Sequence, residues 1–241
     1  MANFVLIHGA WHGGWCWTRV AGRLRRRGHV VHAPSMTGMG DRRHLLSRDI
    51  TFETHVMDFV NTILVERLDD VVLCGHSFGG IVTTAVADRV ADRVRGLVFL
   101  DAFLARDGQS VFDLSPPWRT AEILEAARLH GDGWTVPPQH FERWVEDPVD
   151  RAWVMEMAGP HPLEAMRQPL ALTGAGDAIA NRTYVVAERY RPSPFWQFHD
   201  ALKDDPSWRV TGLPTLHDAM ISMPDAVAAI LEDAAARPRD G

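Results

Sequence analysis

The sequence predicts an α/β protein with a mostly parallel sheet of about six strands, covered by helices on both faces. Three observations predict it. Short, almost continuously apolar segments alternate with longer segments whose apolar residues recur at helical spacing. A glycine-rich turn at residues 75–79 joins one apolar segment directly to a helical one. A tryptophan-containing stretch at residues 106–176 interrupts the alternation. Continuous apolar strands are typical of parallel sheets because both of their faces are buried.

The first half of the chain alternates strands and helices in a regular order. Strands are expected at residues 4–8, 29–34, 70–75 and 95–103. Helices are expected at residues 17–28, 51–68 and 79–94. Gly28 is placed to end the first helix and Pro34 to stop the second strand, and Thr51 is expected to cap the second helix.

Residues 106–176 break this pattern. They contain several helix-like pieces and no convincing strand, and they carry four tryptophans: Trp118, Trp134, Trp144 and Trp153. Strands then resume at 182–188 and 208–213, and helices at 193–204 and 225–236. The simplest interpretation is a helical cap at 106–176, inserted after the strand that ends at Asp101. Residues 1–105 and 177–241 would form the core of the same folding unit.

Composition narrows the functional class. With 241 residues, 46% of them hydrophobic, the chain can bury one sizeable core. The net charge of −6, without a basic stripe, gives no support for nucleic-acid binding. We see no signal peptide and no apolar run near the roughly 20 residues that a membrane span needs. Cys16 and Cys74 lie in apolar contexts and are expected to be buried thiols, which predicts a cytoplasmic protein.

The turn at residues 75–79 reads Gly-His-Ser-Phe-Gly and matches G-x-S-x-G. Between a strand and a helix, this pattern is typical of a nucleophile elbow, in which a sharp turn presents the serine hydroxyl at the carboxyl edge of the sheet. The alternative is a tight turn with an incidental serine. The strand before it, the helix after it and the partners described next favour Ser77 as a catalytic nucleophile.

A serine nucleophile needs a base and an acid. His217 lies in the loop between the last strand and the last helix, where an open α/β sheet presents residues at its carboxyl edge. We therefore expect His217 to be the base. Two carboxylates could orient it. Asp101 ends the strand that follows the elbow, and Glu188 ends the next sheet strand, so the residues alone leave both open.

The segment at residues 8–17, "HGAWHGGWCW", follows the first strand. Acyl transfer needs two backbone N–H groups directed at the developing oxyanion. Ala10 in this loop and Phe78 after the serine are the candidates. His8 and His12 are expected to hydrogen-bond loop backbone, in preference to catalysis or metal binding. Trp11 and Met220 flank the two loops and are candidates for the substrate pocket. No metal or organic cofactor is expected.

These features resemble the α/β-hydrolase superfamily, and within it the group of plant methyl esterases and hydroxynitrile lyases with its bacterial esterase-like relatives. The segments that carry the resemblance are "FVLIHGAWHGGWCW", "PSMTGMGDR", "GHSFGG", "LDAF" and "HDAMISMPDAVA". The resemblance covers nearly the whole chain and implies the α/β-hydrolase fold with a helical cap over an apolar pocket. It also implies Ser77 as nucleophile, His217 as base, and Ala10 and Phe78 as oxyanion donors.

The sequence departs from this group at the acid. The plant enzymes place it a few residues after the strand that ends here in "VVAERYRPSP", where this chain has only Glu188. Other branches of the superfamily use the position of Asp101, which we therefore expect to be the acid, with Glu188 as the alternative. The lyases carry a threonine and a lysine where this chain has Gly9 and Asp218, so hydrolysis is preferred.

The expected function is that of a carboxylesterase-type serine hydrolase. It would cleave an ester of a small, apolar or aromatic substrate through an acyl-enzyme intermediate. The alternative is a lyase or cyclase that acts on an aromatic natural product with the same fold, and after it a small-molecule binding protein. A small molecule is the expected partner, with neither nucleic acid nor membrane, and a homodimer is the assembly considered.

Overall fold

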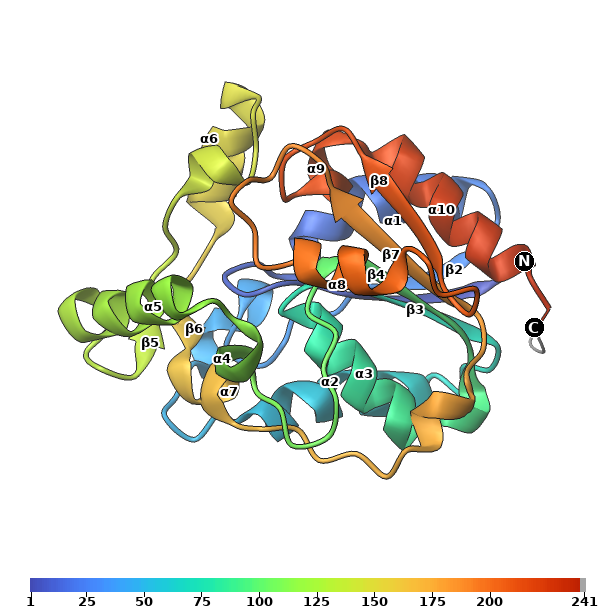
Figure 1. Ribbon diagram of the computed structural model, residues 1–241, viewed down its shortest axis with the longest axis horizontal. Helices are drawn as coiled ribbons and strands as arrows, with labels where there is room; N and C mark the ends of the chain where they lie inside the picture. Colours follow the sequence, from blue (N-terminus) through green and yellow to red (C-terminus); the bar gives the residue numbers. More distant parts are fainter. Residues whose placement is uncertain (239–241) are drawn as a thin grey trace.

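The computed structural model describes residues 1–238, and six of its strands form one parallel sheet (Figure 1). The order across the sheet is β2–β1–β3–β4–β7–β8, and every neighbouring pair is parallel. The strands are β1 (Asn3–Ile7), β2 (Val30–His32), β3 (Val71–Ser77), β4 (Val94–Ala102), β7 (Arg182–Ala187) and β8 (Arg209–Leu213). The central strand β3 is buried along its whole length. The predicted fold class is confirmed.

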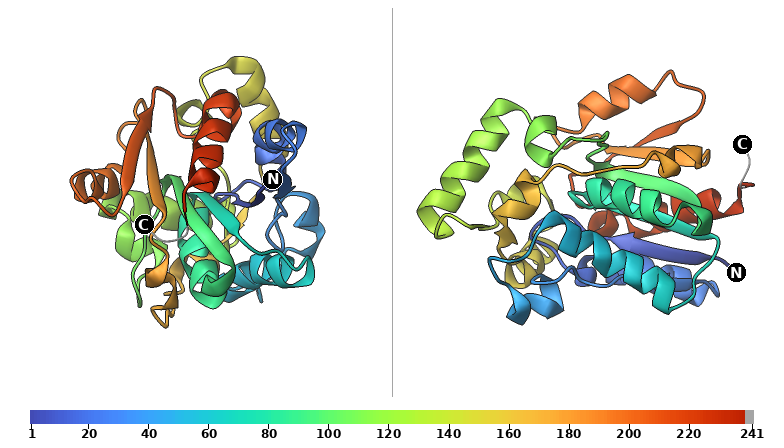
Figure 2. Two further views of the ribbon diagram at one scale, coloured as in Figure 1. Left: turned by 90° about the vertical axis from the view of Figure 1, so that its right-hand side faces the viewer. Right: turned by 90° about the horizontal axis from the view of Figure 1, so that it is seen from below.

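Helices cover both faces of this sheet (Figure 2). One face carries α1 (Thr18–Arg26) and α10 (Pro224–Ala236), which pack against each other. The opposite face carries α2 (Phe52–Val65) and α3 (Gly79–Arg89). Two shorter helices complete the core: α8 (Trp196–Leu202), which contacts β7, and α9 (Ala219–Ser222), which precedes α10. Among residues 1–238, no helix is both long enough and apolar enough to span a membrane.

Local chemistry explains where the helices begin and end. Thr51 caps α2 as expected, because its hydroxyl accepts the Thr54 N–H while the Thr54 hydroxyl accepts the Thr51 N–H. The helix expected at residues 79–94 is shorter. It ends at Arg89, because Val90 leaves the helical region with φ −136°, and a short 3-10 turn at Ala91–Arg93 leads into β4. Outside the cap helices, further 3-10 turns lie at Gly14–Trp17, Gly40–Leu45 and Ala175–Ala178.

We name residues 106–176 the cap segment. Its helices lie beyond the carboxyl ends of the strands, and the trace that follows them runs back along α3 to residue 176 (Figure 1). They contain α4 (Val111–Leu114), α5 (Pro117–His130), α6 (Pro148–Met157), α7 (Leu163–Arg167) and a 3-10 turn at Phe141–Arg143. The expectation that no strand occurs here is wrong in one respect. The two-residue strands β5 (Thr135–Val136) and β6 (His161–Pro162) form an antiparallel pair. Two residues per strand are too few to produce the alternation by which a strand is read from sequence.

Buried histidines hold the loops at the carboxyl edge of the sheet. His8 follows β1 and donates from Nδ1 to the Gly9 carbonyl at 2.8 Å, while its Nε2 accepts the Met36 N–H at 2.9 Å. His55 on α2 donates from Nε2 to the Thr37 carbonyl at 3.2 Å. Burial lowers the pKa of His8 to about 3 and that of His55 to about 4. Both rings are therefore neutral in the folded protein at physiological pH.

These neutral histidines predict a loss of stability in mild acid. Unfolded histidine has a pKa of about 6.5, so below that pH the unfolded chain binds protons that the folded chain does not. The free energy of unfolding should be unaffected by these two groups above pH 6.5. It should fall below that pH by about 1.4 kcal/mol per pH unit for each of His8 and His55. Urea unfolding at pH 7.5, 6.0 and 5.0 measures this slope.

His55→Gln should reduce the slope by one proton, whereas Asn61→Gln, at an exposed position of the same helix, removes no titratable group and should leave the slope unchanged. A free energy of unfolding that stays constant between pH 7.5 and 5.0 would contradict the assignment of neutral rings.

The start of α3 is in van der Waals contact with the backbone of β1. A Cβ atom at Gly79 would lie 2.5 Å from the carbonyl oxygen of Ile7 and 2.6 Å from that of His8. Because these neighbours are backbone atoms of a central strand and its loop, they cannot move aside as a flexible side chain would. The glycine therefore allows helix, strand and loop to meet next to residue 77.

Substitution of this glycine should destabilise the protein although alanine is the better helix former. Gly79→Ala should cost about 1–3 kcal/mol of unfolding free energy through overpacking. The matched control is Gly22→Ala in α1, where the nearest atom, Nη1 of Arg26, is 3.6 Å from the new methyl group. This control should stabilise the protein by about 0.5–1 kcal/mol. Urea unfolding compares the two variants, and equal effects would contradict the close approach.

Candidate active site

Ser77 occupies a strained turn between β3 and α3. It is the last residue of β3 and has φ +54°, in the left-handed region that non-glycine residues rarely adopt. Its carbonyl accepts the Phe103 N–H at 3.1 Å, which ties the turn to the segment after β4. The α3 helix begins two residues later, so its N-terminal amides and their dipoles lie next to the serine. This is the strand–turn–helix context that the G-x-S-x-G pattern predicted.

His217 and Asp101 form a buried hydrogen bond. Nδ1 of His217 lies 2.6 Å from Oδ2 of Asp101, and the other carboxylate oxygen accepts the Ala187 N–H at 3.1 Å. Because Nδ1 carries the proton donated to the carboxylate, Nε2 of the neutral ring holds a free lone pair and can act as a base. Burial lowers the pKa of His217 to about 3, and burial also raises the pKa of Asp101.

Of the two carboxylates that the sequence left open, Asp101 is the one in contact with His217. Like Ser77, it sits at the end of a central strand with a positive φ, here +42°. Glu188 is exposed, and its carboxylate lies against Gly212 of the neighbouring strand β8. The strand that was expected to end at residue 188 ends one residue earlier, and the Glu188 N–H donates to the Leu213 carbonyl.

Ser77 and His217 line the same small cavity, of about 40 Å³, together with Ala10 and Phe78. The rest of its wall is mostly apolar and comes from the core loops and the cap segment: Trp11, Phe103, Val111, Ser115, Arg119, Ile123, Trp144, Met166, Tyr190, Pro194 and Phe195. A larger cavity of about 870 Å³ lies elsewhere, against β4, α3 and α8, and includes none of the sequence-predicted site residues. The chemistry of the site therefore belongs to the smaller cavity.

The two residues suggested for the pocket lie in different places. Trp11 lines the cavity, and its indole N–H donates to the Val136 carbonyl of the cap segment at 2.9 Å. Met220 is not among the residues that line the cavity. Its side chain is fully buried in the hydrophobic core.

Two aromatic rings lie against the imidazole of His217. The Tyr190 ring lies 4.7 Å from it with an interplanar angle of 25°, and the Phe195 ring lies 5.1 Å away at 8°. Sequence reasoning missed both residues, although Tyr190 stands two positions after Glu188. Contact with both rings restricts rotation of the imidazole.

Arg119 of α5 is a further residue that the sequence analysis missed. Its guanidinium lies over the Trp11 ring at 5.5 Å, and Nη1 donates to Glu122 at 2.9 Å. It brings a positive charge to the cavity wall, and that charge contributes to the lowered pKa of His217. The sequence around residue 119 gave no signal for this role, because only the folding of the cap segment brings it to the cavity.

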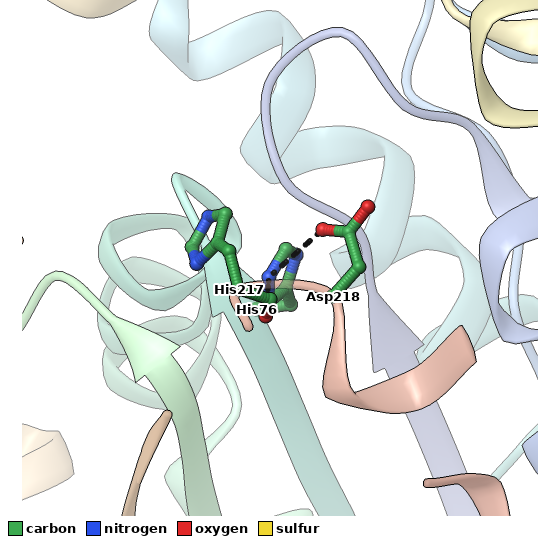
Figure 3. A group of neighbouring side chains, drawn as sticks. All are labelled: His76, His217 and Asp218. Carbon is green, nitrogen blue, oxygen red and sulfur yellow. Dashed lines mark hydrogen bonds and ion pairs between the residues drawn. The ribbon is translucent and has the colours of Figure 1, made fainter. Parts of the chain in front are cut away.

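His76, His217 and Asp218 place ligand-type atoms within 4.8 Å of one another (Figure 3). Hydrogen bonds already use two of these groups. Nε2 of His76 donates to the His217 carbonyl at 3.1 Å, and Nδ1 of His217 donates to Asp101. These two bonds use one nitrogen of each imidazole, which leaves Nδ1 of His76 and Nε2 of His217 without a hydrogen bond among the described residues. The third group is engaged as well, because Oδ2 of Asp218 contacts Nε2 of His12.

His8 and His12 bond to loop backbone, as expected. His8 bonds to Gly9 and Met36, and Nδ1 of His12 lies 2.8 Å from the Ala10 carbonyl. His12 also contacts Asp218, which the sequence analysis did not anticipate.

Comparisons with known proteins agree with this architecture. The chain matches the sequence profile described as "Alpha/beta hydrolase family" over residues 4–230. It is 42% identical to "Carbendazim hydrolyzing esterase" of Nocardioides sp. (strain SG-4G), over 95% of this chain and 97% of that protein. It is 28% identical to "Methylesterase 7" of Arabidopsis thaliana, over 67% of this chain and 54% of that protein.

A solved structure is similar over the full length. It is described as an "Extracellular alpha/beta-hydrolase from Paenibacillus species" that "shares structural and functional homology to Tobacco Salicylic Acid Binding Protein 2". The TM-score is 0.83 at 26% identity, and the match covers 100% of both chains. The resemblance to plant methyl esterases and bacterial esterases is confirmed. This chain belongs to the alpha/beta hydrolase family.

Proposed function

We propose that this protein is a carboxylesterase-type serine hydrolase with Ser77 as nucleophile, His217 as base and Asp101 as acid. One observation carries the proposal. His217 donates to Asp101 over 2.6 Å and lines, together with Ser77 on its strained turn, one cavity. Nucleophile and orienting carboxylate thus come from the ends of β3 and β4, and the base comes from the loop after β8, in the chain order Ser–Asp–His that α/β-hydrolases use.

The proposed reaction is acyl transfer in two steps. His217 Nε2 accepts the Ser77 proton as the serine oxygen attacks the ester carbonyl. The backbone N–H groups of Ala10 and Phe78 donate to the oxyanion that forms. His217 then gives its proton to the departing alcohol, and an acyl-enzyme remains. In the second step His217 takes a proton from water as the water oxygen attacks the acyl carbon. His217 then returns that proton to the Ser77 oxygen as the bond between serine and acyl group breaks, which releases the acid.

Asp101 acts through His217. Its carboxylate fixes the tautomer in which Nδ1 carries hydrogen, and it stabilises the imidazolium that exists only after proton transfer. This support is needed because burial lowers the pKa of His217 and so penalises the imidazolium. The negative charge 2.6 Å away opposes that penalty at the stage where the positive charge develops.

The substrate class follows from the cavity wall. Its volume is small and its lining is rich in aromatic side chains, which favours a small ester with an apolar or aromatic acyl group. The cap segment supplies part of this lining, so we propose that it encloses the substrate. The similarity to the carbendazim-hydrolyzing esterase of Nocardioides makes carbendazim the first substrate to test. No observation favours the lyase, cyclase or binding-protein alternatives over hydrolysis.

The proposal also extends to location and assembly. Cys16 and Cys74 are buried free thiols, which supports the cytoplasm as the proposed compartment. A homodimer stays a prediction, to be measured by size-exclusion chromatography with light scattering.

Ser77→Ala and His217→Gln should abolish turnover of p-nitrophenyl acetate, p-nitrophenyl butyrate and carbendazim. Each variant removes a group that takes part in proton transfer or bond formation, so kcat should fall by about 10⁴-fold or more. A fluorophosphonate probe should label the wild type at Ser77, as located by peptide mapping, and should not label Ser77→Ala. Substantial turnover by folded Ser77→Ala would instead favour a reaction without a serine nucleophile.

Asp101→Asn tests the acid, with Glu188→Gln as the matched control. Asparagine can stabilise the wrong tautomer of His217, so kcat should fall by about 10³–10⁴-fold while KM changes little. Glu188→Gln removes an exposed carboxylate and should leave kcat within about twofold of the wild type. The reverse pattern would move the acid to Glu188. Steady-state kinetics on both variants, at a pH where both are folded, give the answer.

A further inference from the structure

Both ring nitrogens of His12 face hydrogen-bond acceptors. Nδ1 lies 2.8 Å from the Ala10 carbonyl oxygen, and Nε2 lies 3.1 Å from Oδ2 of Asp218. A neutral imidazole has one N–H and one acceptor nitrogen, so it can satisfy only one of these contacts. The doubly protonated ring satisfies both. His12 and Asp218 are almost fully buried, at 2% and 0% exposure, so solvent cannot provide the second partner.

The rings around His12 also suit a cation. The Trp15 ring lies 5.3 Å away with an interplanar angle of 26°, and the Trp144 ring lies 5.3 Å away at 39°. Indole faces attract a positive charge placed over them at this separation. Trp15 comes from the segment after β1 and Trp144 from the cap segment, so the imidazole is held between core and cap.

The titratable groups that face the pair agree with this charge assignment. Burial alone lowers the pKa of His12, but the charge of Asp218 and its hydrogen bond outweigh that effect and raise it. Burial raises the pKa of Asp218, and His12 outweighs this and lowers it to about 2. Cys16 is buried beside them, and its pKa is raised, which keeps the thiol uncharged.

The neighbouring imidazoles leave His12 as the cation. His76 lies 3.7 Å from the other Asp218 oxygen, and burial lowers its pKa well below the ordinary value. It therefore stays neutral, with its Nε2–H directed at the His217 carbonyl (Figure 3). The figure also shows the His217 ring and the Asp218 carboxylate turned away from each other, so these neighbours in sequence face different partners.

The contact between His12 and Asp218 joins three parts of the proposed active site. His12 binds the carbonyl of Ala10, whose N–H is the proposed oxyanion donor. Asp218 directly follows His217, the proposed base. The Asp218 N–H donates at 3.0 Å to the carbonyl of Trp144, which lines the cavity from the cap segment. Oxyanion loop, histidine loop and cap thus meet at one buried contact.

We propose that His12 and Asp218 form a buried ion pair that positions the Ala10 loop and the His217 loop for catalysis. The proposal rests on the proposed esterase function. Neither residue lines the cavity, so both are positioning residues and neither touches substrate. Removing the charge of either residue should disturb both loops, because the other residue is then left as an uncompensated charge in a dry interior. It gives a role to the second histidine of "HGAWH" and to the aspartate after His217.

The charge state of His12 is tested on the wild-type protein, without reference to activity. Protein labelled with ¹⁵N-histidine is examined at pH 8 by NMR correlations between ring nitrogens and ring protons, and the His12 signals are assigned by their loss in His12→Gln. The proposal predicts that both nitrogens of His12 carry hydrogen at pH 8, where an ordinary histidine is neutral. A single protonated nitrogen would overturn it.

The positioning role is tested by kinetics on His12→Gln and Asp218→Asn. Displacement of either loop by about 1 Å should lower kcat about 100-fold. KM should change little, because neither residue lines the cavity. The control is Asp88→Asn, which removes a carboxylate that accepts the Thr173 and Gly176 N–H groups far from the triad, and it should leave kcat unchanged. An unchanged kcat in both pair variants, or a loss confined to KM, would overturn the role.

Two further readouts keep the test decisive. If a pair variant lacks a wild-type-like urea transition, the pH dependence of wild-type kcat decides. The rate should fall at the alkaline pH at which NMR shows His12 losing its proton, and a kcat that stays constant through that deprotonation would overturn the role.

If the wild type hydrolyses no ester, the proposed function fails, and the rate of fluorophosphonate labelling at Ser77 replaces kcat. Equal labelling rates in wild type and pair variants, or no labelling at all, would overturn the positioning role.

Discussion

The hydrogen bond between His217 and Asp101 is the interaction on which the rest of the site depends. It joins the loop after β8 to the end of β4, and it fixes which nitrogen of the imidazole is free to act as a base. Tyr190 and Phe195 stack on the same ring and hold its plane. Without this bond, no carboxylate would orient the histidine that shares a cavity with Ser77. With it, the strained serine, the histidine and the carboxylate form one group of side chains.

The histidines buried at the carboxyl edge of the sheet differ in charge, since some are neutral and one is a cation. His8, His55 and His76 are buried as neutral rings, because desolvation penalises their cationic forms. His12 is the exception, since a carboxylate and a carbonyl face its two nitrogens. All four imidazoles are buried, so the difference in their charge comes from their hydrogen-bonding partners. The same edge therefore provides a neutral base next to a fixed ion pair.

Much of this could be predicted from sequence because the signals are local. Apolar runs fixed the strands, and the strand–turn–helix context of residues 75–79 singled out the serine. The contact between Asp101 and His217 could not be predicted from the sequence, because it spans 116 positions. Arg119, the pair of His12 with Asp218 and the failure of Met220 to reach the cavity share this cause. Each depends on how the cap segment and α9 pack, which residue spacing does not encode.

The most direct test of the central claim is to look for the acyl-enzyme itself. Wild-type protein mixed with p-nitrophenyl butyrate is quenched in acid during turnover, and its intact mass and peptides are measured. A butyryl group should be found on the peptide that contains Ser77, and it should disappear as substrate is exhausted. Sustained ester turnover without acylation of that serine, in samples quenched throughout the time course, would contradict the account.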